Sequence, residues 1–200
     1  MFRTAPIRPQ RGFTLVELLV GAVLIATLTL ILVPPLLSAS AKLRLRLAAA
    51  EVATTLYRAR SEAIRLRHNV GLRFDRDDDG RVTFTLYRDT DGDGLRNADI
   101  RRGIDGPLAP PRRLDLGRGI RFGFPRPAPR RDPSGRRLVR LGDPVRFNRS
   151  DLASFSPLGT STPGSVYLTD SRGILVAVRL LGRTGKVRIV TWDPETDTWH

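Results

Sequence analysis

The sequence contains no cysteine and only two histidines, His68 and His200. Without cysteine the chain can form neither a disulfide framework nor a thiolate metal site. It also lacks P-loop, G-x-S-x-G and H-E-x-x-H patterns, and its carboxylates cluster only where turns are expected. We therefore expect a structural or binding protein and not an enzyme, with no cofactor other than a metal ion held by oxygen ligands.

Acidic residues are few beside basic ones, and the formal net charge is +14. The excess is uneven. Arg101–Arg149 carries +10, from fourteen arginines and four aspartates, whereas Ser150–His200 is neutral. A strongly basic segment favours an acidic partner such as nucleic acid or anionic lipid.

Near the N-terminus lies a long apolar run. Leu18–Leu37 comprises twenty uncharged, mostly apolar residues, enough for a helix to span a bilayer. Arg3, Arg8 and Arg11 precede it, so the positive-inside rule keeps the N-terminus in the cytoplasm and exports the rest. A cleaved secretory signal is the alternative, but the run is too long and no A-x-A-like site follows it. We expect a single-pass protein of the bacterial inner membrane.

Glu17 stands at the start of this run, where a charge costs about 2.5–3.5 kcal/mol or more and needs a reason. The stretch Gly12-Phe13-Thr14-Leu15-Val16-Glu17 resembles the class III leader motif of type IV pilins and type II secretion pseudopilins. The resemblance implies that a prepilin peptidase cleaves between Gly12 and Phe13 and that Phe13 is then methylated. Glu17 would pair with the Phe13 ammonium of a neighbouring subunit; alternatively, it lies near the headgroups.

Two prolines and an amphipathic segment follow. Pro34 and Pro35 predict a kink, or else the end of the membrane helix. Beyond them, apolar residues recur every three or four positions, which predicts one buried stripe on a helix; they are Leu45, Ala49, Val52, Leu56, Ala59, Ala63 and Leu66. We expect one helix from Phe13 to about His68, with the stripe packed on a sheet; a coiled-coil seam is the alternative.

From Val70 the apolar period shifts towards two, which is typical of strands. Strands are predicted at 70–75, 81–89, 119–124, 144–148, 165–170, 174–181 and 186–192. A helix followed by an antiparallel meander is an α+β fold. The connection from Gly103 to Arg140 is predicted to be a long Pro/Arg-rich loop, and loops of this length are usually functional or mobile.

The second half of the sequence resembles a more specific group within this family. "LYRARSEAIRLRHNVGLRF", "FSPLGTSTPGSVYLTD" and "GRTGKVRIVTW" resemble the GspH/FimT-type pseudopilin domain. The matching positions are Ala59, Arg60, Ala63, Ile64, Phe155, Gly159, Gly164, Gly182, Arg183 and Arg188. The resemblance implies a pilin-like fold: a long N-terminal helix, transmembrane in its first half, on an antiparallel β-sheet domain.

Asp89–Asp99, "DTDGDGLRNAD", resembles the first half of an EF-hand calcium loop. Asp89, Asp91 and Asp93 would converge on one cation, with Asn97 and Asp99 as further ligands. The second half departs from the pattern, because Ile100 stands where a bidentate acid belongs. The alternative is a hairpin tip built of turn-forming residues. "DRDDDG", Asp75–Gly80, is expected to be a plain hairpin turn.

Two basic sets are candidates for contact with DNA phosphates. Arg130, Arg131, Arg136 and Arg137 lie in the Pro/Arg-rich segment. Lys186 and Arg188 on the last predicted long strand resemble the basic C-terminal element of DNA-binding members of the FimT group. The alternative is a solvated surface in an arginine-rich chain.

The sequence thus predicts four parts: a leader at 1–12, a transmembrane half-helix at 13–37, an amphipathic stalk helix at 38–68 and a periplasmic β-rich domain at 69–200. The leading hypothesis is a minor pseudopilin of an inner-membrane, pilus-like filament acting in type II secretion. A FimT-like minor type IV pilin serving pilus assembly or DNA uptake is the alternative. The expected partners are other pseudopilins or pilins, the prepilin peptidase, the inner membrane and secreted protein substrates, with DNA less favoured.

Overall fold

The computed structural model describes residues 14–200 apart from positions 78, 80, 149 and 171, and it leaves the side chains at 33–35, 37 and 38 undescribed. The chain divides into two compact units, Met1–Ser40 and Ala41–His200, and each is described by itself.

Helix α1, Leu15–Leu66, contributes to both units. It ends two residues before the predicted end at His68, because Arg67 takes the left-handed conformation (φ 55°) that commonly follows a last helical residue. Pro34 and Pro35 both lie within α1, so the alternative that they end the helix is wrong. The predicted kink at these prolines stays a prediction.

In the second unit, α1 presents the predicted stripe to a core. Leu45, Ala49, Val52, Leu56, Ala59 and Ala63 are completely buried, and Leu66 packs against them partly exposed. Each fully buried leucine or valine contributes about 1.5–3 kcal/mol to folding. The Tyr57 hydroxyl also donates a hydrogen bond of 3.3 Å to the Val187 carbonyl of the sheet. The stripe therefore packs on strands, as predicted, and is not a coiled-coil seam.

Two antiparallel sheets follow the helix. The first has the order β3-β2-β1-β7, with β4 also paired to β2. Its strands are β1 (Val70–Arg76), β2 (Val82–Arg88), β3 (Gly106–Pro107), β4 (Arg112–Arg113) and β7 (Leu152–Phe155). In the central pair, Val70 lies opposite Arg88 and Arg76 opposite Val82.

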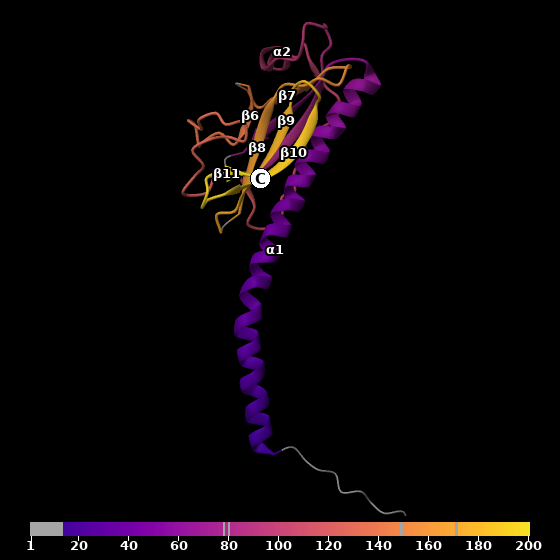
Figure 1. Cartoon of the computed structure of the whole chain (residues 1–200). Helices are drawn as coiled ribbons and strands as arrows, with labels where there is room; N and C mark the ends of the chain where they lie inside the picture. The colour runs from indigo at the N-terminus through magenta and orange to yellow at the C-terminus, as the bar shows by residue number, and fades with distance from the viewer. Residues whose placement is uncertain (1–13, 78, 80, 149, 171) are drawn as a thin grey trace, which may run out of the picture. The chain divides into compact units, whose positions relative to one another are not determined.

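The second sheet has the order β11-β10-β9-β8-β5, with β6 also paired to β8. Its strands are β5 (Arg121–Phe122), β6 (Val145–Phe147), β8 (Gly164–Thr169), β9 (Leu175–Leu181), β10 (Lys186–Asp193) and β11 (Thr198–Trp199). Figure 1 shows β8, β9 and β10 side by side. The predicted α+β class with antiparallel strands is confirmed, but the expected single meander is two sheets.

One core joins the stalk helix to both sheets. Alternate residues of β1, β8 and β9 point into it, including Leu72 and Phe74 of the first sheet and Val166, Leu168 and Val178 of the second. Phe74 stacks on Phe147, with ring centroids 6.1 Å apart. Both sheets therefore depend on the same apolar cluster.

Two glycines, Gly159 of the resemblance and Gly185, allow the Arg60 side chain to lie close to the strand connections. A Cβ at Gly159 would lie 2.9 Å from Arg60 Nη2, and one at Gly185 would lie 2.9 Å from Arg60 Nε. Both glycines also have positive φ, 80° and 60°, which disfavours other residues. The matched positions Arg60 and Gly159 thus serve packing.

The Pro/Arg-rich segment is not a structureless loop. Besides β3, β4 and β5, its second half covers the outer face of the second sheet. Phe124 lies in a cluster with Tyr167, Leu175, Ala177 and Trp192, and Ala128 and Leu138 pack against it. Arg179 donates a hydrogen bond to the Pro133 carbonyl (2.7 Å), and Trp199 donates one to the Arg131 carbonyl (2.9 Å). A few apolar side chains, and hydrogen bonds that side chains of the sheet donate to its backbone carbonyls, therefore hold a segment whose composition predicts exposure.

Candidate functional site

The start of α1 is closed by Thr14 and Glu17. The Thr14 backbone N–H and hydroxyl both donate to Glu17 Oε2 at 2.9 Å, and the Glu17 N–H donates to Thr14 Oγ1 at 3.2 Å. This reciprocal arrangement is a capping box, which satisfies two backbone donors that a helix start leaves open. The sequence interpretation missed it, although a threonine three residues before a glutamate is its ordinary signature. Gly12 and Phe13 lie outside the described residues.

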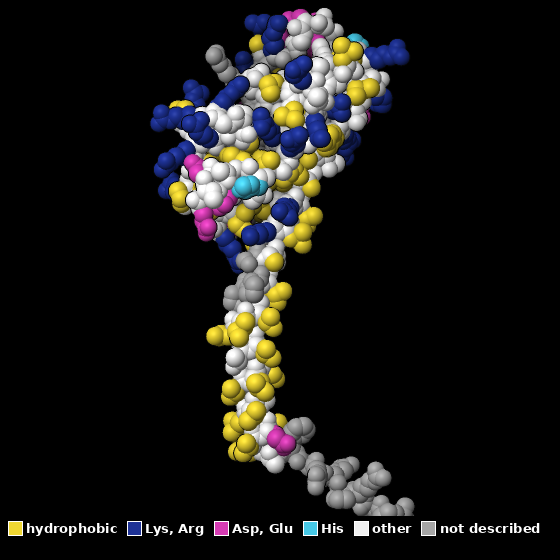
Figure 2. All heavy atoms as spheres, in the orientation of Figure 1, with side chains coloured by type: hydrophobic (Ala, Val, Ile, Leu, Met, Phe, Trp, Pro, Cys, Tyr) yellow, Lys and Arg dark blue, Asp and Glu magenta, His cyan; other side chains and the backbone are white. Residues whose placement is uncertain are grey.

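Glu17 retains capacity for another partner. All of its side-chain hydrogen bonds to described residues use Oε2, so Oε1 accepts none from that part of the chain. The surrounding helix is apolar: Leu15–Leu32 is the one stretch among the described helices long and apolar enough to cross a membrane, and none of it is buried. Figure 2 shows these apolar side chains along the helix, with the acidic group at its beginning.

The aspartate loop follows β2, and Asp89 is its anchor. Asp89 is 1% exposed and accepts hydrogen bonds from Asn69 (2.7 Å), Gly92 N–H (2.8 Å) and Gly94 N–H (3.1 Å). Burial alone would raise the pKa of Asp89, but these hydrogen bonds outweigh it and lower the pKa below its ordinary value. The loop is thus wrapped around an ionised carboxylate.

Three of the five predicted calcium ligands come together. Carboxylate oxygens of Asp89, Asp91 and Asp93 all lie within 4.8 Å of one another. Asp99 is outside this group and lies in α2 (Asn97–Arg102), with its Oδ1 3.9 Å from Arg102. Asn97 instead lines a pocket described below.

Asp105, which the sequence interpretation overlooked, lies at this loop. It is 1% exposed, and its Oδ1 accepts the N–H of Thr90 at 3.2 Å. Burial raises the pKa of Asp105, and the charges of Asp89 and Asp91 raise it further. No local spacing pattern identifies Asp105, because it is twelve residues beyond Asp93 along the chain.

The candidate DNA residues gather on the outer side of the second sheet. Arg188 lies opposite Arg179 in the pairing of β10 with β9, and Lys186 lies two residues before it. Arg179 shares a pocket with Arg136 and Arg137, to which Arg146 and Arg183 also belong. Arg130 and Arg131 lie at the base of the neighbouring turn, where Arg131 faces Arg137 across an isolated bridge. Arg136 and Arg137 of the first predicted set therefore share one surface with the second set, and Arg130 and Arg131 lie next to it.

We call this surface the basic face: Arg136, Arg137, Arg146, Arg179 and Arg183, with Lys186 and Arg188 beside them. None of these seven side chains forms an ion pair with a described residue. Figure 2 shows Lys and Arg side chains spread over the visible side of the folded unit. The basic face can bind an anion without first breaking an internal salt bridge.

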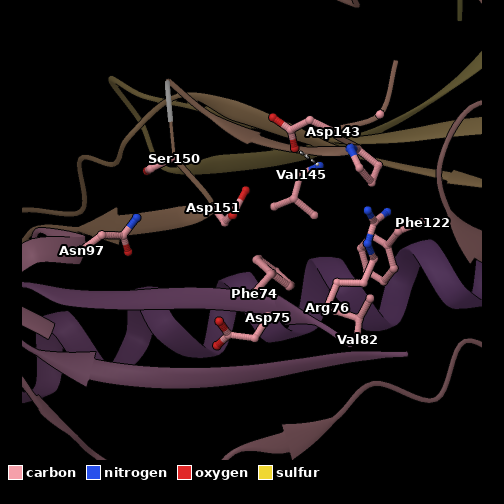
Figure 3. Close-up of a pocket in the computed structure, with 12 residues that line it drawn as sticks. Phe74, Asp75, Arg76, Val82, Asn97, Phe122, Asp143, Val145, Ser150 and Asp151 are labelled. Atoms are coloured by element: carbon pink, nitrogen blue, oxygen red, sulfur yellow. Dashed lines mark hydrogen bonds between the residues drawn. The ribbon is translucent and has the colours of Figure 1, made fainter. Parts of the chain in front are cut away.

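A separate pocket opens beside the ends of β1 and β6 (Figure 3). Asp143 and Asp151 line it with Asp75, which is paired to Arg73 at 2.6 Å. Burial raises the pKa of Asp151, and the charges of Asp143 and Asp75 add to the effect. The described residues that line it include no histidine or lysine, and Ser150 Oγ donates to the Phe147 carbonyl. These residues offer no nucleophile paired with a base.

Comparison with protein families identifies both parts of the chain. Residues 7–33 match the prokaryotic N-terminal methylation motif, and residues 48–189 match the type II transport protein GspH. No curated protein and no solved structure matches the chain significantly. The second match covers well over half of the chain, including the stalk stripe from Ala49, the first sheet, most of the second sheet and the aspartate loop. The chain therefore belongs to the GspH family, and it is a minor pseudopilin of type II secretion with an N-terminal methylation motif.

Proposed function

We propose that the chain is cleaved between Gly12 and Phe13, methylated at Phe13 and held in the inner membrane by α1, with the folded unit Ala41–His200 in the periplasm. The observation that carries this proposal is an exposed apolar helix that starts shortly after the predicted leader. Glu17 lies in its first turn and accepts the Thr14 N–H. Arg3, Arg8 and Arg11 keep the leader on the cytoplasmic side.

In the assembled filament, Glu17 pairs with the ammonium of Phe13 on a neighbouring subunit. Cleavage creates that ammonium, and pairing offsets the cost of holding both charges among apolar side chains. Oε2 can remain in the cap while Oε1 accepts the ammonium, since a carboxylate has lone pairs on both oxygens. The pair sets the axial position of each added subunit, and the filament helps to move folded substrates across the outer membrane.

The orientation is testable with reporter fusions. Alkaline phosphatase joined after His200 should be active, because it reaches the periplasm. Green fluorescent protein joined at the same position should not fluoresce, because it does not fold correctly after Sec export. Replacing Arg3, Arg8 and Arg11 with glutamine should lower the phosphatase activity by weakening the charge bias. An inactive phosphatase fusion with intact expression would contradict the proposed orientation.

As a second function, we propose that the basic face binds a polyanion such as DNA. The observation that favours it is the gathering of guanidinium groups that lack carboxylate partners among the described residues. Binding driven by phosphate contacts weakens as salt rises, with a slope of about −0.9 per contact in a plot of log K against log salt for duplex DNA. Base stacking contributes little, since no aromatic side chain lines the pocket except Tyr167.

The measurement is duplex DNA binding by the full chain in detergent micelles over a salt series. Replacing Lys186 and Arg188 with glutamine should weaken binding and reduce the salt slope by about two, one unit for each lost contact. Replacing the exposed Arg65, which is paired with Glu62 on the stalk helix, is the matched control and should change neither. Absence of binding at low salt would remove this second function and leave the secretion role unaffected.

A further inference from the structure

The aspartate loop has the dimensions of a calcium site. Calcium binds oxygen ligands at about 2.3–2.6 Å, so ligands on opposite sides of the ion lie about 5 Å apart. Oxygens of Asp89, Asp91 and Asp93 all fall within 4.8 Å of one another, a spacing at which one ion can contact all three. Carboxylates without histidine or cysteine favour a hard cation over zinc or copper.

Hydrogen bonds within the aspartate loop already fix its backbone conformation. Gly92 and Gly94 adopt positive φ values of 82° and 96°, which let their N–H groups turn inward to Asp89. Asp89 accepts three hydrogen bonds but has about four lone-pair positions, so one remains for a cation. Asp91 accepts only a long hydrogen bond from Asp93 N–H (3.4 Å) among described residues, and Asp93 is paired through Oδ2 with Arg96 (2.6 Å).

Asp105 is an independent indication of a ligand. Its Oδ2 is buried and has no hydrogen-bond partner among the described residues, while the whole side chain is 1% exposed. Its other oxygen accepts the N–H of Thr90, which lies between Asp89 and Asp91 in the chain, so the carboxylate contacts the loop. A buried carboxylate with one unpaired oxygen is costly, and a cation is a partner that it can share with the other carboxylates of the loop.

We propose that Asp89, Asp91 and Asp93 bind one calcium ion and that Asp105 contacts it through one water molecule. Asp105 thus takes the place of the acid that the local pattern lacks at Ile100, since calcium loops also hold a ligand through water. Asn97 and Asp99 are not in this ligand set. The ion ties the end of β2 to the start of β3 and so orders the segment 89–105, which carries α2.

The test is calorimetry of the full chain in detergent micelles, titrated with calcium chloride. One ion should bind, with Kd in the range of about 10⁻⁵–10⁻³ M. At a hundredfold excess of calcium over Kd, the thermal midpoint should rise by roughly 5–10 °C. Asp91→Asn, which alters an exposed side chain, should weaken binding at least about tenfold because it removes one charged ligand.

Asp105→Asn should reduce the calcium-dependent rise, and it should raise the midpoint measured with chelator, because a buried charge with one unpaired oxygen is gone. Asp79→Asn is the matched control: it alters an exposed aspartate in the other acidic turn, whose ion-pair partner among the described residues is Arg81, and should bind calcium like the wild type. If Asp105→Asn does not fold, Asp91→Asn decides the outcome alone. No binding by the wild type, or wild-type binding by both loop variants, would overturn the proposal.

Discussion

Replacing Glu17 with leucine should abolish incorporation of the subunit into the filament while the leader is still cleaved. The variant leaves the neighbouring Phe13 ammonium unpaired among apolar side chains, and an uncompensated buried charge costs about 3–5 kcal/mol. Incorporation should therefore fall at least about a hundredfold. The measurement is the amount of variant recovered in sheared or affinity-purified filaments, relative to its amount in the membrane.

The capping box makes a sharper comparison available. Glutamine at position 17 can still accept the Thr14 hydrogen bonds that close the helix but carries no charge. Glu17→Gln should therefore fail to assemble, like Glu17→Leu. Thr14→Ala keeps the charge and loses the cap, at a cost of about 0.5–2 kcal/mol in helix stability, and should still assemble. Normal assembly of Glu17→Gln together with failure of Thr14→Ala would mean that Glu17 serves only the helix start.

Replacing Gly164 with alanine should destabilise the folded unit by about 3 kcal/mol, the upper end of the usual cost of overpacking. A Cβ at Gly164 would collide with the backbone of β6: it would touch the Arg146 carbonyl and lie 2.7 Å from the Phe147 Cα. Backbone cannot rotate away as a side chain can, so β6 must separate from β8 at the register pair Phe147–Gly164. Phe147 is completely buried, and its displacement would disturb the shared core.

Gly142→Ala is the matched control for this effect. A Cβ there would meet no atom within 4 Å, and the φ of Gly142 is not in the left-handed region. It should leave stability unchanged or raise it by about 0.4–1 kcal/mol through the unfolded chain. Thermal unfolding of both variants should show a midpoint lowered by roughly 6–12 °C for Gly164→Ala alone. Equal midpoints would mean that β6 is not packed against β8 as described.

The stalk helix and the long strands could be predicted because their apolar periods are long and uninterrupted. The stripe from Leu45 to Ala63 covers about five turns, and its predicted members are buried except for the last, Leu66, which is partly exposed. Strand β7 escaped prediction because Leu152–Phe155 is only four residues long and has no clear alternation. The division of the strands into two sheets was also not predicted. A period of two indicates which residues face a core, but it does not indicate which strands pair.

The site could be predicted only where its residues are close in sequence. Asp89, Asp91 and Asp93 are alternate residues of one loop, so their convergence follows from spacing. Asp105 is separated from them in the sequence by helix α2, and it contacts the loop through the N–H of Thr90. No spacing rule predicts that contact. The packing of the Pro/Arg-rich segment on the second sheet could not be predicted either. Its few packing residues, such as Phe124 and Leu138, are scattered among prolines and arginines and form no periodic pattern.

The central claim is that this chain is processed as a filament subunit, and the intact mass of the protein purified from membranes tests it most directly. In cells with a prepilin peptidase, the account predicts a single species that lacks Met1–Gly12 and carries one added methyl group on Phe13. In cells without the peptidase, the full chain should remain. An unprocessed N-terminus in the presence of active peptidase would contradict the account and indicate an anchored periplasmic protein that does not polymerise.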